Sequence, residues 1–216
     1  MPPVGIGLVI ALLVISLGIH EAAHAWVALK CGDPTARDLG RITLNPVPHI
    51  DPIMTILLPT LGFMAGGFIF GGAKPVPVNY YNLRSPLRDM ALVAIAGPAS
   101  NFLLAVFFGL CWKLTVKYGV WDANVVGPTI LAKTVQLNLV LAAFNLLPIP
   151  PLDGSRVMTW LLPRGVREPY AALERFGLLI VVGLVVFFPP LQILVWDTVD
   201  LMWSWVNAIV TLGGTW

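Results

Sequence analysis

The chain has few charged residues for its length. Of its 216 residues, 11% are Asp, Glu, Lys or Arg, 57% are hydrophobic, and the mean hydropathy is +0.84. A soluble domain of this size could not cover that much apolar surface, which argues against an ordinary water-soluble globular protein. The net charge is only +2 and the chain has no basic run, so nucleic-acid binding is not expected.

Cysteine is also scarce. The two cysteines, Cys31 and Cys111, are far apart and stand in apolar surroundings. Free, buried thiols are the expected state of such residues. The sequence therefore predicts neither a disulfide framework nor a cysteine-based metal site.

Long apolar runs account for most of the chain. They cover residues 4–29, 90–112 and 134–147, and residues 178–210 with a break at Pro189-Pro190. A membrane-spanning helix needs about 17–25 such residues. These runs predict an all-α polytopic membrane protein with about five to six hydrophobic segments. Because no Lys or Arg precedes Lys30, the first run is expected to be a retained transmembrane helix and not a signal peptide.

Within that first run, "LGIHEAAHAW" (residues 17–26) contains two histidines and a glutamate. On a helix, His20 and His24 lie one turn apart on the same face. This spacing suits two nitrogen ligands of one Zn²⁺, with Glu21 beside them as a base for a water molecule. Ionisable groups are costly inside a membrane, so the cluster indicates a functional site.

A catalytic zinc site usually has three protein ligands. Four further residues are candidates for the third position: His49, Asp153, Asp197 and Asp200. Asp153 has the most favourable context, because Pro148, Pro150 and Pro151 force the backbone to unwind just before it. Unwound backbone at membrane depth is tolerated only where it lines a cavity or is buried in protein.

Three motifs resemble the site-2 protease family of intramembrane zinc metalloproteases: "HEAAH" at residue 20, "AGPASNF" at residues 96–102, and "NLLPIPPLDG" ending at residue 154. The resemblance implies hydrolysis of peptide bonds in or near transmembrane segments of membrane protein substrates, as in regulated intramembrane proteolysis. It also implies one Zn²⁺ per chain with His20, His24 and Asp153 as ligands and Glu21 as catalytic base and acid. Asn101 and Asn145 would be polar groups near the scissile carbonyl.

The two asparagines have a second interpretation that does not depend on the resemblance. Asn101 and Asn145 are amides in apolar predicted helices, where their donors and acceptors need partners. Interhelical hydrogen bonds would satisfy this need equally well.

The chain is short for this family. It is expected to form a single membrane-embedded domain over residues 1–216, with a catalytic core at about 4–160 and a C-terminal helical hairpin at about 170–212. We expect no PDZ insertion and no nucleotide-sensing CBS domain.

The distribution of Lys and Arg predicts the topology. If residues 53–70 dip into the membrane and return, ten Lys and Arg lie on one side and three on the other, which places the motifs near the cytoplasm. A re-entrant segment is therefore expected there, between the first two full spans. The alternating valines of "KPVPVN" (residues 74–79) predict a short edge strand that pairs with extended substrate. Together these features suggest a multi-pass protein of a prokaryotic cytoplasmic membrane.

Two other functions remain open on the sequence alone. Intramembrane His and Asp residues also line ion paths, so a metal-ion transporter or a zinc-binding membrane protein without protease activity is the alternative. An inactive relative acting as a membrane chaperone is a third possibility. The substrate, the oligomeric state and any role of His49 are not determined by the sequence.

Overall fold

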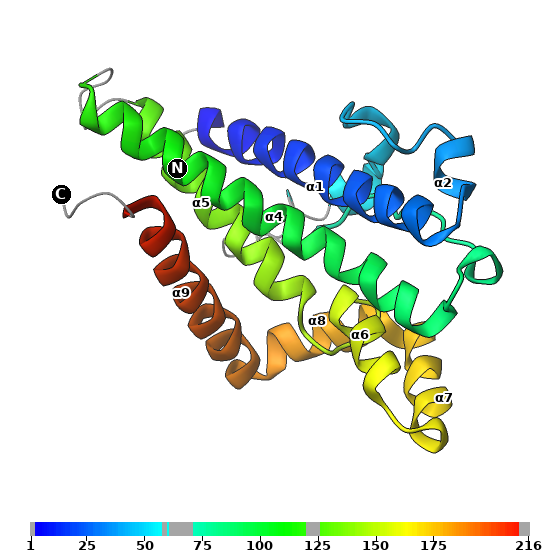
Figure 1. Cartoon of the computed structure of the whole chain (residues 1–216). Helices are drawn as coiled ribbons and strands as arrows, with labels where there is room; N and C mark the ends of the chain where they lie inside the picture. The colour runs from blue at the N-terminus through cyan, green and yellow to red at the C-terminus, as the bar shows by residue number, and fades with distance from the viewer. Residues whose placement is uncertain (1–2, 58–59, 61–70, 120–125, 212–216) are drawn as a thin grey trace. The chain divides into compact units, whose positions relative to one another are not determined.

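The fold is all-helical in the part of the chain that the structure, a computed structural model, describes: residues 3–57, 60, 71–119 and 126–211 (Figure 1). This confirms the all-α prediction. The long helices are α1 (Pro3–Cys31), α4 (Pro86–Lys117), α5 (Val126–Asn145) and α9 (Pro189–Thr211). The shorter elements are α2 (Thr35–Asp38), α6 (Asp153–Leu161), α7 (Arg164–Ala172) and α8 (Gly177–Phe187), with single turns η1 (Val47–His49), η2 (Pro52–Leu57), η3 (Tyr80–Asn82) and η4 (Leu173–Phe176).

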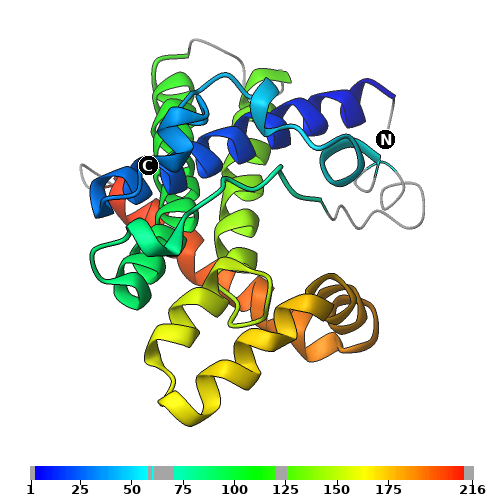
Figure 2. The same ribbon diagram turned by 90° about the vertical axis from the view of Figure 1, so that its right-hand side faces the viewer.

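The chain forms two compact units, Met1–Gly97 and Pro98–Trp216, whose boundary in the sequence falls inside α4. In the first unit, α1 ends in a Schellman motif. Gly32 has φ +111°, its N–H donates to Leu29 O, and the N–H of Asp33 donates to Ala28 O. The chain then passes through α2, η1 and η2. Residues 71–79 form an extended segment that leads to η3 (Figure 2).

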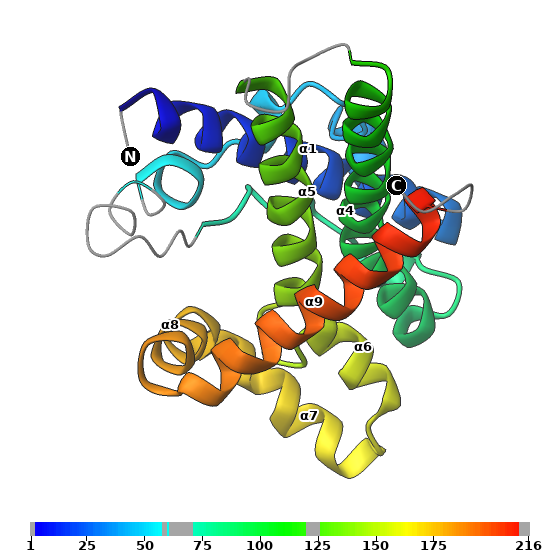
Figure 3. The same ribbon diagram turned by 90° about the vertical axis from the view of Figure 1, so that its left-hand side faces the viewer.

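The core of the second unit lies between α4, α5 and α9. Its buried members combine alanines with larger aliphatic side chains: Ala105, Val135, Leu139, Ala142, Ala143, Val199, Met202 and Val206. The alanines allow helix backbones to approach closely, which favours packing between helices in lipid. Figure 3 shows α9 running against α5.

A buried pair of amides joins α4 to α5 in this unit. The Nδ2 of Asn101 donates to the Oδ1 of Asn138 at 3.0 Å, and neither side chain is exposed. The Nδ2 of Asn138 in turn donates to the carbonyl of Thr134, one turn earlier in α5. This is the interhelical alternative that the sequence left open for Asn101.

Two consecutive prolines separate the last two helices, as the sequence predicted. α8 ends at Phe187 and α9 begins at Pro189. Proline suits the first turn of a helix, where its missing N–H has no intrahelical partner in any case. Between Asp153 and α8 the chain forms α6, α7 and η4.

The number of spanning segments differs from the prediction of five to six. Four helices in the described residues are long and apolar enough to cross a membrane: Ile10–Cys31, Pro86–Lys117, Arg164–Phe187 and Pro189–Thr211. The apolar part of α5, Thr129–Asn145, is shorter. The count is lower because the apolar part of α5 is short and residues 53–70 lie mostly outside the described residues.

The prediction of a short strand at residues 74–79 is also wrong. Residues 74–79 are extended but form no strand, because Pro75 and Pro77 carry no N–H and the N–H of Val76 between them donates to the carboxylate of Glu21 and not to a backbone carbonyl. The re-entrant segment predicted for residues 53–70 falls mostly outside the described residues. Its first part belongs to η2, a turn of π-helix.

We expect Asn138→Leu to destabilise the protein by about 1 kcal/mol, because it removes the acceptor of the amide pair inside lipid-facing helices. Thermal unfolding in detergent micelles measures the change. The control is Gln136→Leu, which introduces the same residue at an exposed position of α5. Equal stability of the two variants would show that the amide pair contributes nothing.

Candidate metal centre

The His-Glu-x-x-His motif lies in the second half of α1, where the helix is buried. His20 is 4% exposed, and Glu21 and His24 are each 8% exposed. The alanines between and after them keep the helix regular and allow close packing, and Ala25 and Ala28 are fully buried. The motif is therefore held by a long rigid helix and shielded from solvent.

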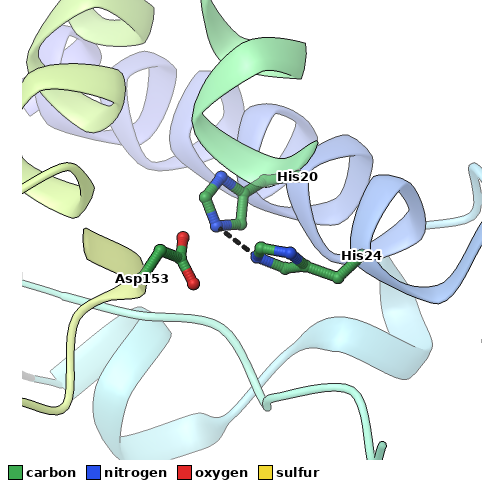
Figure 4. Close-up of side chains that lie close together, drawn as sticks. All are labelled: His20, His24 and Asp153. Carbon is green, nitrogen blue, oxygen red and sulfur yellow. Dashed lines mark hydrogen bonds between the residues drawn. The ribbon is translucent and has the colours of Figure 1, made fainter. Parts of the chain in front are cut away.

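The two imidazoles of the motif face each other. Their Nε2 atoms lie 3.0 Å apart and the rings are nearly perpendicular, at 87° (Figure 4). Two Zn–N bonds of about 2.0–2.1 Å at the tetrahedral angle would place the nitrogens about 3.3 Å apart. The pair therefore fits two ligands of one tetrahedral cation with a shift of a few tenths of an ångström.

The orientation of His24 is set from α4. Its Nδ1 lies 2.7 Å from the carbonyl oxygen of Val93. A carbonyl only accepts, so Nδ1 must carry the proton and the lone pair of the neutral ring stays on Nε2, the atom that faces His20. A backbone acceptor of this kind fixes the tautomer and the ring plane of metal-binding histidines in general.

Glycine is required where α4 passes the imidazoles. A Cβ added at Gly97 would lie 2.5 Å from Cε1 and Nε2 of His20 and 2.5 Å from Cε1 of His24. Real Cβ contacts are essentially never that short, so no other residue fits unless the rings move. The space that both Nε2 atoms need is thus maintained by the absence of a side chain.

Glu21 is also held in place. Its Oε2 accepts a hydrogen bond of 2.8 Å from the backbone N–H of Val76, in the extended segment that follows η2. The carboxylate lies on the residue next to His20, as the motif requires of a base that is not itself a ligand.

Asp153, the favoured third ligand, is the first residue of α6 in the second unit. α5 ends at Asn145, and the following residues up to Leu152 form turns that include the prolines, so the predicted unwinding is present. A Cβ at Gly154 would lie 2.1 Å from Leu146 O, so this glycine allows the start of α6 to pack on the end of α5.

The remaining candidates for a third ligand have other environments. His49 is buried, with Nε2 3.2 Å from Thr43 O and Nδ1 facing the guanidinium of Arg41. Burial lowers the pKa of His49, which keeps the ring neutral. Asp197 and Asp200 are exposed on α9.

The two asparagines make hydrogen bonds within the helical framework. Besides the bond between Asn101 and Asn138, the Nδ2 of Asn145 donates to Leu141 O in the preceding turn of α5. Their proposed place near a scissile carbonyl stays a prediction.

Sequence reasoning missed three groups around the site, namely Val93 O, Gly97 as a steric requirement and Val76 N–H, and it also missed Asn138 in the second unit. The first three act through backbone or through a missing side chain, and although Gly97 lies in the motif "AGPASNF", the motif does not specify which side chains it makes room for. Asn138 could have been found, because it is an amide in the same apolar run, residues 134–147, as Asn145.

Comparison with protein families gives a match to the model "Peptidase family M50" over residues 8–123 and 120–188. No solved structure matches the chain.

Several curated proteins are similar over most of the chain. "Putative zinc metalloprotease YwhC" of Bacillus subtilis (strain 168) is 41% identical over 91% of this chain and 84% of its own length. "Putative zinc metalloprotease Rip2" of Mycolicibacterium smegmatis is 34% identical over 83% of this chain and 66% of its own length. Zinc metalloprotease MJ0392 of Methanocaldococcus jannaschii is 26% identical over 71% of this chain and 34% of its own length.

We expect Gly97→Ala to weaken divalent-metal binding at least tenfold, because the new methyl group would displace both imidazoles. Metal content after dialysis against a zinc buffer measures the effect. Gly183→Ala is the matched control, since it lies in α8 and its Cβ would meet nothing within 4 Å. Full metal content in the Gly97 variant would contradict the steric requirement.

Proposed function

This chain belongs to peptidase family M50, the site-2 proteases, and from that premise we propose that it acts as an intramembrane zinc metalloprotease on peptide bonds in or near transmembrane segments of other membrane proteins. The observation that carries the proposal is the pair of Nε2 atoms 3.0 Å apart beside the buried carboxylate of Glu21. A family match alone would leave open whether this chain retains the chemistry.

His20, His24 and Asp153 are the proposed zinc ligands, and Figure 4 draws all three side chains. Each offers one ligand atom, an imidazole nitrogen or a carboxylate oxygen. Such a nitrogen and oxygen set is typical of catalytic zinc, which keeps a further position for water or substrate. The position of Asp153 directly after the proline-rich turns supports its assignment, as does its match to the family motif.

Glu21 is the proposed general base and acid. A Zn²⁺ held by the proposed ligands would polarise the scissile carbonyl and make water easier to deprotonate. Glu21 takes a proton from the attacking water and then donates it to the nitrogen of the leaving amine. Glu21 is buried where α1 meets the extended segment, and this burial keeps bulk water from competing for the proton.

Asn101 and Asn145 are proposed as polar groups near the scissile carbonyl. A donor that meets the developing oxyanion contributes about 3 kcal/mol in comparable enzymes. Both amide nitrogens act as hydrogen-bond donors, to Asn138 from Asn101 and to Leu141 O from Asn145.

The protein is an integral membrane protein, and we propose that its active site faces the cytoplasm. If residues 53–70 return to the side from which they enter, ten Lys and Arg lie on the side of the motifs and three on the other, which supports this orientation. The bacterial and archaeal origin of the relatives supports a prokaryotic cytoplasmic membrane.

The metal-ion transporter is not favoured. Transport needs ligands along a route, whereas this site has a carboxylate on the residue next to a ligand, bonded to backbone. The family match and the names of the relatives also point to proteolysis.

Glu21→Gln is expected to retain zinc and to lower kcat for a single-span substrate by about 10²–10⁴-fold, because the amide cannot accept the proton. Cleavage in proteoliposomes, with and without chelator, measures it. Glu168→Gln, at an exposed position of α7, is the control and should cleave like wild type. Wild-type cleavage by the Glu21 variant would exclude this residue as the base.

Asp153→Asn is expected to lower zinc affinity by tenfold or more, since a neutral amide is a poor zinc ligand. Competition with a fluorescent chelator reports the affinity. Asp197→Asn removes an exposed carboxylate from α9 and should bind zinc like wild type. If both variants bound zinc equally well, another residue would have to be the third ligand.

A further inference from the structure

The proposed protease mechanism leaves one conspicuous contact of Glu21 without a function. Residues 74–79, here called the strap, run extended beside α1 (Figure 2). Pro75 and Pro77 have no N–H, so Val76 carries the one backbone donor between them. That donor meets Oε2 of Glu21 at 2.8 Å.

Both ends of the strap are fixed by hydrogen bonds. At the start, the N–H of Lys74 donates to His49 O at 2.8 Å, and Nη2 of Arg41 donates to Lys74 O at 2.7 Å. At the end, the N–H of Asn79 donates to Oδ2 of Asp33 at 2.7 Å. The backbone of the strap is therefore restrained on either side of Val76.

Asp33 is a buried carboxylate that the catalytic assignment does not use. It is 0% exposed and accepts four hydrogen bonds, from Asn79 N, Asn82 Nδ2, Thr35 N and Thr35 Oγ1. Burial would raise the pKa of Asp33, but these hydrogen bonds outweigh it and hold the pKa below its usual range. Because Asp33 ends the Schellman motif of α1, it ties the strap to the helix that bears the catalytic motif.

We propose that the Val76 N–H positions the Glu21 carboxylate for proton transfer, and that Asp33 and Arg41 are positioning residues that hold the strap in register for this contact. The inference rests on the proposed protease function. A glutamate side chain has three rotatable bonds, and one hydrogen bond to Oε2 restricts them while Oε1 remains for the proton. Restraint of this kind matters because small displacements of a reacting group greatly reduce rate.

Because Val76 lies between two prolines, its N–H can be removed by substitution without a large change of backbone conformation. Val76 precedes Pro77 and is already restricted to extended conformations. Val76→Pro is therefore compatible with the extended backbone of the strap, and it deletes the N–H. Alanine at position 76 shortens the side chain and keeps the N–H.

We expect Val76→Pro to lower kcat about tenfold or more relative to Val76→Ala, with KM for the same single-span substrate and zinc content changed less than twofold. Equal kcat in the two variants would overturn the proposal. A higher kcat in Val76→Pro would also overturn it, because the strap would then restrain Glu21 in an unproductive position.

Hydrogen exchange gives a readout that requires no metal and no turnover. In full-length, metal-free protein labelled with ¹⁵N-valine in micelles, the Val76 amide should exchange at least tenfold more slowly than in Glu21→Ala. Identical exchange rates would show that the contact is not formed, even if a Val76 variant failed to fold.

Asp33→Asn is expected to lower kcat severalfold and to speed exchange of the Val76 amide, with zinc content unchanged. Asp38→Asn is the matched control, since that exposed carboxylate pairs with its neighbour Arg37 in α2 and not with the strap. If wild-type protein neither bound zinc nor cleaved substrate, the protease function would fail. If it did both while the strap variants behaved like their controls, this inference alone would fail.

Discussion

The burial of two imidazoles and a carboxylate in one turn of an apolar helix is the constraint on which the first unit depends. Ionisable groups in such surroundings lose their hydration, and each needs a specific partner in return. His24 meets a backbone carbonyl, Glu21 meets a backbone N–H, and the two histidines meet each other. The elements around α1 are arranged so that these partners are within reach.

The partners come mainly from backbone, which suits a membrane protein. Backbone groups add polarity without adding a charged side chain to an apolar sequence, and they are fixed by the secondary structure that bears them. Gly97 likewise acts without a side chain, because the absence of a Cβ makes room for both rings. The few charged residues that are buried, such as Asp33 and Arg41, hold the chain that supplies these groups.

The sequence predicted well whatever depends on local pattern. The apolar runs indicated the long helices, Pro189-Pro190 placed the break between α8 and α9, and the motif spacing placed His20 and His24 on one face. It failed for residues 74–79, where alternating valines suggested a strand. Strand formation needs a continuous backbone partner, and here the N–H groups of Val76 and Asn79 donate to the side chains of Glu21 and Asp33, which no local pattern encodes. The family and the zinc metalloprotease function could be predicted from the sequence because short local motifs such as "HEAAH" identify them.

The hydrogen bond between His24 and Val93 joins residues 69 positions apart. During synthesis, a nascent chain that has not yet inserted α4 lacks both the carbonyl that selects the His24 tautomer and the glycine that makes space for the rings. The placement of both imidazoles thus depends on the docking of a later helix on an earlier one, so the geometry of the motif is a tertiary property and not one of α1 alone.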